Sequence, residues 1–303
     1  MSAELHSLLT DIKAAARIGH TESLWVALDG VFDLPEVVGN PPMREAFIRR
    51  AILPIGEALT HPRVTTPTLR PLITHDHAAI RAIAAVALAN QYCSGEKVKL
   101  KDLTTIGRDP RKDVRQALAF ALRQKGVQSP DKLLALVQGW LDHKSPRLIA
   151  VALQLLPSLA EEKPNEAVEL LSAFQPSSDP EVRSSLVDCL VELAQGEFSD
   201  EVLSLLEKWE AQAKNHVWVI GKALSRSWAA AHTKRALEIL THLATQQGPE
   251  KILLKTLKAM RRHGADEAIE QIVHQWRQDP NPNLQAIAEQ MTKKTENHHS
   301  EKT

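Results

Sequence analysis

A turn with the pattern Asp-Pro followed by Val-Arg recurs along the chain, each time just before an apolar segment with helical spacing. Its most complete form is Asp109-Pro110-Arg111-Lys112-Asp113-Val114-Arg115, and a shorter form is Asp179-Pro180-Glu181-Val182-Arg183. Looser forms occur at 76–81, 145–147 and 279–280. A unit of this size can bury its apolar side only against its neighbours, so the recurrence predicts a stack of helical repeats rather than separate globular domains.

The basic residue just inside each apolar segment gives the repeat length. Successive basic residues lie 34, 32, 36, 39 and 33 positions apart. They are Arg81, Arg115, Arg147, Arg183, Lys222 and Lys255. A variable period with two helices per unit fits HEAT repeats better than the stricter families of about 33 or 34 residues. We therefore predict an all-α fold, a right-handed α-α superhelix built as a HEAT-like helical-pair solenoid.

The composition suits closely packed helices. Hydrophobic residues make up 43% of the chain and charged residues 24%, but aromatic residues only 4%. Ala and Leu are abundant, and they favour helices over β-sheets. The clearest helical spacing is that of Val114, Ala117, Leu118 and Ala121, which fall on one side of a helix.

Irregular segments divide the chain into three expected regions. Residues 34–42 contain three prolines and a glycine, which predicts a long loop. The final residues lack apolar side chains and are expected to be disordered. We expect an N-terminal helical cap and loop at 1–42, a HEAT-like repeat solenoid at 43–292 and a disordered tail at 293–303.

The sequence predicts a cytoplasmic protein that does not enter a membrane. It has no apolar run of about 18 residues, and its first residues lack the basic and apolar blocks of a signal peptide. Cys93 and Cys189 stand 96 positions apart without Cys-x-x-Cys spacing. Two buried thiols in a reducing compartment are the expected arrangement.

The repeated turn has a structural explanation. An Asp before a helix accepts backbone N–H groups and a Pro presets the first turn, so Asp109 and Asp179 are expected to cap the helices that follow. The Arg that follows can reach an acid or a carbonyl of the adjacent unit and form a ladder. For Arg81, Arg115 and Arg183 the alternative is contact with a ligand. We favour the ladder because periodic recurrence is what a packing role predicts.

The formal net charge of zero hides two opposed blocks. Residues 160–210 contain 13 acids and 3 bases, whereas residues 214–262 contain 10 bases and 2 acids. At ~100° per residue, four bases of the second block form one stripe opposite an apolar side. They are Lys251, Lys255, Lys258 and Arg262. The stripe contacts a ligand such as phosphate if it lies on the concave side of the stack, and otherwise it is a solvated outer face.

Segments 178–194, 205–209 and 217–226 resemble the repeats of bacterial HEAT-like DNA alkylation repair proteins. Their Pro-Glu-Val-Arg and Trp-Val-Ile-Gly-Lys-Ala-Leu runs are similar to that family's Pro-x-x-Val-Arg and Trp-Val-x-x-x-Ala-Leu segments. The resemblance covers about 50 of the 303 residues and implies a basic concave groove that holds duplex DNA. Ser184 and Asp188 stand where the family usually has Arg and Asn.

The resemblance also implies a place for one aromatic residue. Active members of the family use aromatic side chains and an Asp to stabilise a departing cationic base, and Trp218 is the position carried over. Asp188 is the nearest acid in sequence, and packing is the alternative role for Trp218. The candidate binding residues for a partner or nucleic acid are Lys222, Arg226, Lys251, Lys255, Lys258, Arg262 and Trp218.

Other motifs are weak. His75-Asp76-His77 lacks a third metal ligand, and no phosphate loop or nucleophile motif occurs, so we assign no catalytic residue, metal or cofactor. We expect a cytoplasmic HEAT-repeat scaffold that binds a macromolecular partner, in the first instance protein, in its concave groove. The alternative is a DNA-binding alkylation repair protein or, if the chain is an enzyme, an alkyl-purine DNA glycosylase.

Overall fold

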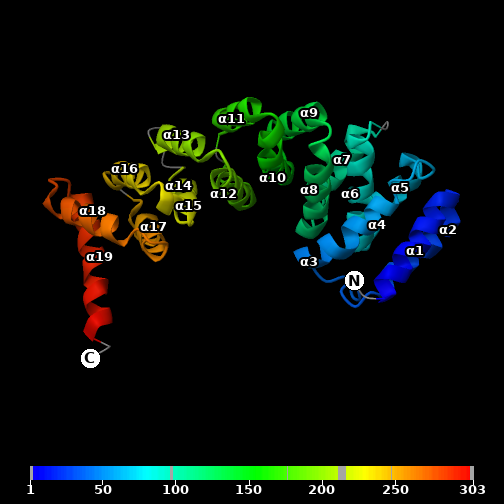
Figure 1. Cartoon of the computed structure of the whole chain (residues 1–303), viewed down its shortest axis with the longest axis horizontal. Coiled ribbons are helices and arrows are strands. Elements are labelled where there is room, and N and C mark those ends of the chain that lie inside the picture. The colour runs from blue at the N-terminus through cyan, green and yellow to red at the C-terminus, as the bar shows by residue number, and fades with distance from the viewer. Residues whose placement is uncertain (1–2, 96–97, 176, 211–215, 247, 301–303) are drawn as a thin grey trace. The chain divides into compact units, whose positions relative to one another are not determined.

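The computed structural model describes residues 3–95, 98–175, 177–210, 216–246 and 248–300, with side chains as far as 292. Every regular element in these residues is helical, which confirms the all-α prediction for them (Figure 1). The chain divides into two compact units, Met1–Leu170 and Leu171–Thr303. No described helix is both long and apolar enough to cross a membrane.

Unit 1 begins with two helices and a loop, and then forms helix pairs. Its elements are α1 (Ala3–Ile18), α2 (Thr21–Asp29), η1 (Gly30–Asp33), α3 (Glu45–Phe47), the π-helical η2 (Ile48–Ile52), α4 (Leu53–Ala58), α5 (Thr66–Ile73), α6 (Ala78–Cys93), α7 (Leu100–Gly107), α8 (Lys112–Gly126), α9 (Pro130–Leu141) and α10 (Pro146–Glu162). α6 lies at the centre, packed against α4, α5 and α8. Its seven alanines leave room for close approach, and almost all of its residues are buried.

Unit 2 has two rows of helices. Its elements are α12 (Pro180–Gln195), α13 (Ser199–Glu210), α14 (Val217–Leu224), α15 (Trp228–Ala231), α16 (Thr233–Ala244), α17 (Glu250–Arg262), α18 (Asp266–Gln278) and α19 (Pro282–Ser300). α13, α16 and α18 pack in sequence as a first row, and α12, α14 and α17 as a second (Figure 1). α11 (Pro164–Ala173) crosses the boundary between the units.

The six basic residues that gave the period fall in α6, α8, α10, α12, α14 and α17, one helix of each pair. The domain boundaries expected at 42 and 292 stay predictions. The backbone of α19 is helical as far as Ser300, and residues 301–303 lie outside the described residues. Cys93 and Cys189 are buried and are not joined in a disulfide, as expected.

The Asp residues of the two clearest turns have different roles. Asp179 caps α12 as predicted, because its carboxylate accepts the N–H groups of Glu181 and Val182 at 2.8 and 3.2 Å. Asp109 does not cap α8, which starts at Lys112. Its carboxylate instead accepts the Arg111 N–H at 2.8 Å and pairs with Arg81 at 2.6 Å.

The Arg residues of the turns also differ from one another. Arg81 forms the predicted ladder contact, since it joins Asp109 of the next turn to the carbonyl of His75 at 2.7 Å in its own turn. Arg115 donates to the carbonyl of Asp109 within its own turn. Arg183 lies over the ring of Trp218, with its guanidinium carbon 5.1 Å from the ring centroid.

The loop after η1 is fastened to the first turn of α8. Arg111 donates to the carbonyls of Asn40 and Pro41 at 3.1 and 2.7 Å, and Asp113 accepts the N–H of Met43 at 2.7 Å. Burial on its own raises the pKa of Asp113. The hydrogen bonds from Arg111 and Met43 and the Arg111 charge outweigh burial and hold that pKa below its ordinary value.

Candidate functional site

α17 presents its basic stripe to solvent. Leu253, Leu257 and Met260 are buried on the opposite side of the helix. Lys251, Lys255 and Arg262 are exposed and Lys258 is half-buried, which agrees with the spacing of the sequence. The stripe therefore lies on the side of α17 opposite its buried residues.

α14 contributes an aromatic residue, Trp218, that lies close to two cations. Trp218 is partly exposed, with the Arg183 guanidinium carbon 5.1 Å and the Lys222 ammonium 5.9 Å from its ring centroid. The indole face attracts cations through its quadrupole, so these contacts fix the ring. Trp218 therefore differs from four other tryptophans, which are buried packing residues. Those four are Trp140, Trp209, Trp228 and Trp276.

α12 places acids on the same side of the second row. Asp188, Glu192 and Gln195 are exposed, whereas Leu186 and Leu190 are fully buried on the opposite side. The helical period accounts for this division, since positions 188, 192 and 195 share one side of the helix. The second row thus begins with an acidic helix and ends with a basic one.

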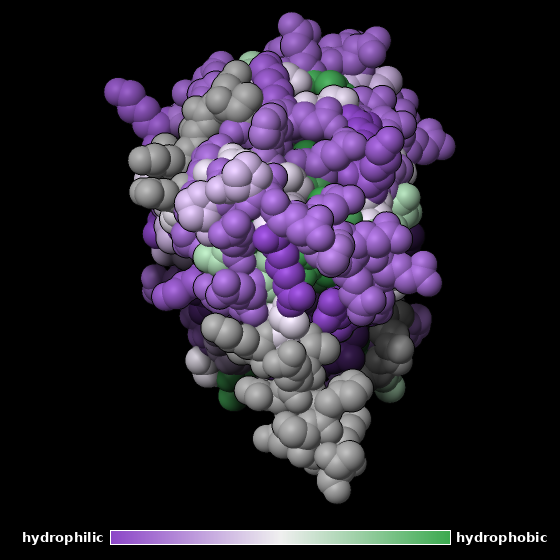
Figure 2. Space-filling view, turned by 90° about the vertical axis from the view of Figure 1, so that its left-hand side faces the viewer, coloured by the Kyte–Doolittle hydropathy of each residue, from purple (hydrophilic) through white to green (hydrophobic). Residues whose placement is uncertain are grey.

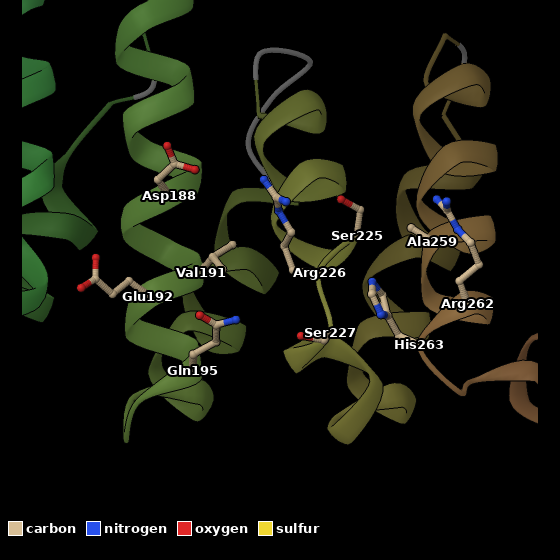
Figure 3. Close-up of a pocket in the computed structure, with 10 residues that line it drawn as sticks. All are labelled: Asp188, Val191, Glu192, Gln195, Ser225, Arg226, Ser227, Ala259, Arg262 and His263. Carbon is tan, nitrogen blue, oxygen red and sulfur yellow. The ribbon is translucent and has the colours of Figure 1, made fainter. Parts of the chain in front are cut away.

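A groove of about 920 Å³ lies between these two helices. We call it the α12–α17 groove. Its lining residues come from α12, from the segment between α14 and α15, from α17 and from the residue that follows α17 (Figure 3). They are Asp188, Val191, Glu192, Gln195, Ser225, Arg226, Ser227, Ala259, Arg262 and His263. Figure 3 shows the α12 acids on one side, Arg226 in the middle, and Arg262 with His263 on the other side.

In the first row, the acidic and basic blocks neutralise each other. Arg235 of α16 pairs with Asp200 and Glu207 of α13 at 2.9 and 2.8 Å. His242 of α16 lies 2.7 Å from Glu210 of α13. Burial raises the pKa of Glu210, although the hydrogen bond from His242 and its charge oppose the shift. Three acids of α13, Asp200, Glu207 and Glu210, are therefore engaged within the fold.

In the second row, the same two blocks face the groove instead. Within the described residues, neither Asp188 nor the Arg226 side chain has an ion pair or hydrogen bond, and both are exposed. The Arg262 guanidinium makes one long contact, at 3.4 Å, to the carbonyl of Lys258. These charges are solvated in the free protein and available to a charged ligand.

A close contact sets the position of α17 beside α14. A Cβ on Gly221 would lie 2.5 Å from Cγ1 of Ile252, so only glycine permits this approach. Thr256 is fully buried and donates its hydroxyl to the Gly221 carbonyl at 2.9 Å. The stripe of α17 is thereby held next to Trp218 and Lys222 of α14.

Two of the sequence-predicted residues, Arg226 and Arg262, line the groove. The other five, Lys222, Lys251, Lys255, Lys258 and Trp218, lie on α14 and α17 outside that lining. Sequence reasoning missed Glu192, Gln195, Ser225 and His263 as groove residues. The only sequence signal for the α12 side of the groove was Asp188, at a position where the family that segment 178–194 resembles usually has Asn.

Other surfaces show weaker features. Figure 2 shows the side on which the C-terminal helices lie, where hydrophilic residues cover most of the surface and hydrophobic ones appear only in narrow strips between them. The imidazoles of the His75-Asp76-His77 segment serve the backbone: His75 accepts the His77 N–H at 3.0 Å, and His77 accepts the Ala79 N–H at 3.2 Å. His77 thus caps α6.

No family model matches the chain, and no curated protein matches it. A solved structure described as the crystal structure of an engineered protein, from the Northeast Structural Genomics Consortium, aligns with 86% of this chain and 100% of its own length. That alignment has 17% sequence identity and a TM-score of 0.31. Likeness at this level assigns no function.

Proposed function

We propose that the helix pairs are HEAT-type repeats of a right-handed superhelical, cytoplasmic scaffold, and that the scaffold binds a segment of a partner protein in the α12–α17 groove. The observation that carries the proposal is the opposed charge across the groove, with Asp188 on one side, Arg226 in the middle and Arg262 on the other side. A protein segment carries both signs of charge and can satisfy both walls, whereas a polyanion satisfies only one.

The lining of the groove favours a polar polymer over a small apolar ligand. Only Val191 and Ala259 contribute apolar side chains. Small-molecule sites are lined mainly by apolar and aromatic groups with a few polar ones, which is the reverse of this composition. The lining also comes from three successive segments of the second row, and repeat proteins use surfaces shared between repeats in this way for macromolecules.

The test is selection of a phage-displayed library of random dodecapeptides on the full chain. We expect enriched peptides whose binding to Arg226→Glu or Asp188→Lys is lost. The matched controls are Lys234→Glu and Glu270→Lys, which make the same charge changes at exposed positions of the first row. Enriched peptides that bind all four variants alike would show that the groove is not the site.

Duplex DNA is the second candidate, favoured by the uninterrupted bases of the α17 stripe. Its affinity should fall steeply as salt rises, because each neutralised phosphate releases counterions. The triple substitution of Lys251, Lys255 and Lys258 by Glu should abolish binding. Absence of duplex binding at low salt rejects this candidate. If binding occurs, release of free alkylated base from treated DNA tests for glycosylase activity.

A further inference from the structure

The three groups of charges in the α12–α17 groove follow one another in a fixed order. Asp188 and Glu192 come first on α12, Arg226 lies next on the segment after α14, and Arg262 at the end of α17 follows with His263 directly after it (Figure 3). The electrostatic potential therefore changes from negative at α12 to positive at Arg226 and α17. A ligand with a single sign of charge is attracted at one wall and repelled at the other.

The geometry points to a bound peptide that crosses the second row in one orientation, with Lys or Arg side chains against α12 and Asp or Glu side chains against Arg226 and Arg262. This inference rests on the proposed function and adds the chemistry and direction of the partner segment. Among the described residues, Asp188 and the Arg226 side chain have no ion pair or hydrogen bond, and Arg262 makes a long contact of 3.4 Å to the Lys258 carbonyl, so ion pairs from the peptide to these three residues replace no ion pair within the fold.

The packing distances also set the spacing of the charges on the peptide. Neighbouring packed helices lie roughly 8–10 Å apart, so α12 and α17, with α14 between them, stand roughly 16–20 Å apart. An extended chain advances about 3.3 Å per residue, so about five or six residues separate its basic from its acidic side chains. The exposed cations Lys255 and Lys251 extend the acid-binding end along α17.

The wall on α12 makes orientation specific. An acidic end placed over α12 would meet Asp188, and the repulsion of like charges would weaken binding. Gly221 and Thr256 hold α17 at a fixed distance from α14, so the acid-binding end does not shift relative to Arg226. The order of the charges therefore sets the direction of the bound peptide, and the packing of the helices sets the spacing between its basic and acidic side chains.

The experiment uses the full chain and two fluorescent block peptides, each with a run of Lys, a Gly-Ser spacer of matching length and a run of Glu. One carries a photo-cross-linking residue at its Lys end and the other at its Glu end. We expect mass spectrometry to place the Lys-end cross-links on α12 and the Glu-end cross-links on α17. The variant with Asp188→Lys and Arg262→Glu should exchange these positions.

Affinity provides the second readout. By anisotropy, the block peptide should bind about tenfold tighter than a peptide of the same composition with alternating Lys and Glu, which is about 1.4 kcal/mol. The single variants Asp188→Asn and Arg262→Gln should remove this difference and serve if the double variant does not fold. Cross-links without preference, equal affinities, or displacement by duplex DNA would overturn the inference. If library peptides still depend on the groove in that case, the proposed function stands and only the orientation is wrong.

Discussion

Thr256 donates its buried hydroxyl to the backbone carbonyl of Gly221 at 2.9 Å, across a contact with no space for a side chain on Gly221. The bond joins the two helices that carry Trp218 and the basic stripe. It also satisfies a hydroxyl that is fully buried, which would otherwise destabilise the fold.

Replacing Gly221 by Ala should destabilise unit 2. The new Cβ would lie 2.5 Å from Cγ1 of Ile252, and overpacking of this kind costs about 1–3 kcal/mol. Gly139→Ala is the matched control, because nothing lies within 4 Å of a Cβ there and alanine favours the helix by up to about 1 kcal/mol. Urea unfolding followed by circular dichroism compares them. Equal effects would mean that the close contact is not tight in solution.

The ladder contact between Arg81 and Asp109 should contribute strongly to the stability of unit 1. The two side chains are only 13% and 6% exposed, so Asp109→Ala leaves a nearly buried guanidinium without its carboxylate. We expect a loss of about 3 kcal/mol. Glu45→Ala removes the exposed partner of Arg49 and should change stability by less than about 1 kcal/mol. If Asp109→Ala and Glu45→Ala lowered the stability in thermal unfolding by similar amounts, burial would not be what makes the Arg81–Asp109 pair important.

Acid should weaken the start of α6. Burial is the largest reason that the pKa of His77 lies below its ordinary value of 6.5, and the charges of His75, Arg111 and Arg81 add to the shift, against the hydrogen bond to Val37. The unfolded chain then takes up the proton first. The contribution of His77 to the free energy of unfolding is therefore fully present above pH 6.5. It falls as the pH drops toward the pKa that His77 has in the folded protein, which is below 6.5.

The variant that tests this effect is His77→Asn, since Asn caps a helix without titrating. It should stay folded at neutral pH and lose less stability than the parent protein when the pH falls from neutral into the acid range. His6→Asn, at an exposed site on α1, is the control. The idea fails if all three proteins show the same pH dependence of unfolding.

Cys93 should resist thiol reagents in the folded protein. Burial raises its pKa to about 11, against the lowering effect of Lys132 and Lys125. At pH 8 roughly one thiol in a thousand is then ionised, and the side chain is also covered. Titration with a chromogenic disulfide should detect Cys93 only after denaturant is added. Rapid reaction in buffer alone would show that α6 opens locally.

Helical periodicity was enough to predict the all-α fold and the exposed stripe of α17. It was not enough for the α12 wall, because Asp188 faces α17 only through packing that no local pattern encodes. Arg183 was expected to reach an acid or a carbonyl of the adjacent unit, but it lies over the aromatic ring of Trp218. Asp109 was expected to cap α8, yet the Arg81 pair holds its carboxylate elsewhere. Each miss involves a tertiary partner that competes with a local rule.

The attachment of the 34–44 loop to α8 has a consequence for synthesis. The backbone N–H of Met43 donates to Asp113, which is synthesised 70 positions later, whereas most helices of unit 1 pack against helices that are near in sequence. At roughly 5–20 residues per second, a ribosome needs roughly 4 to 14 seconds to add that stretch. The loop of the nascent chain can therefore bond first to the start of α6, through His77 and Ala78, and it gains its contacts with α8 only when the first turn of α8 has left the ribosome.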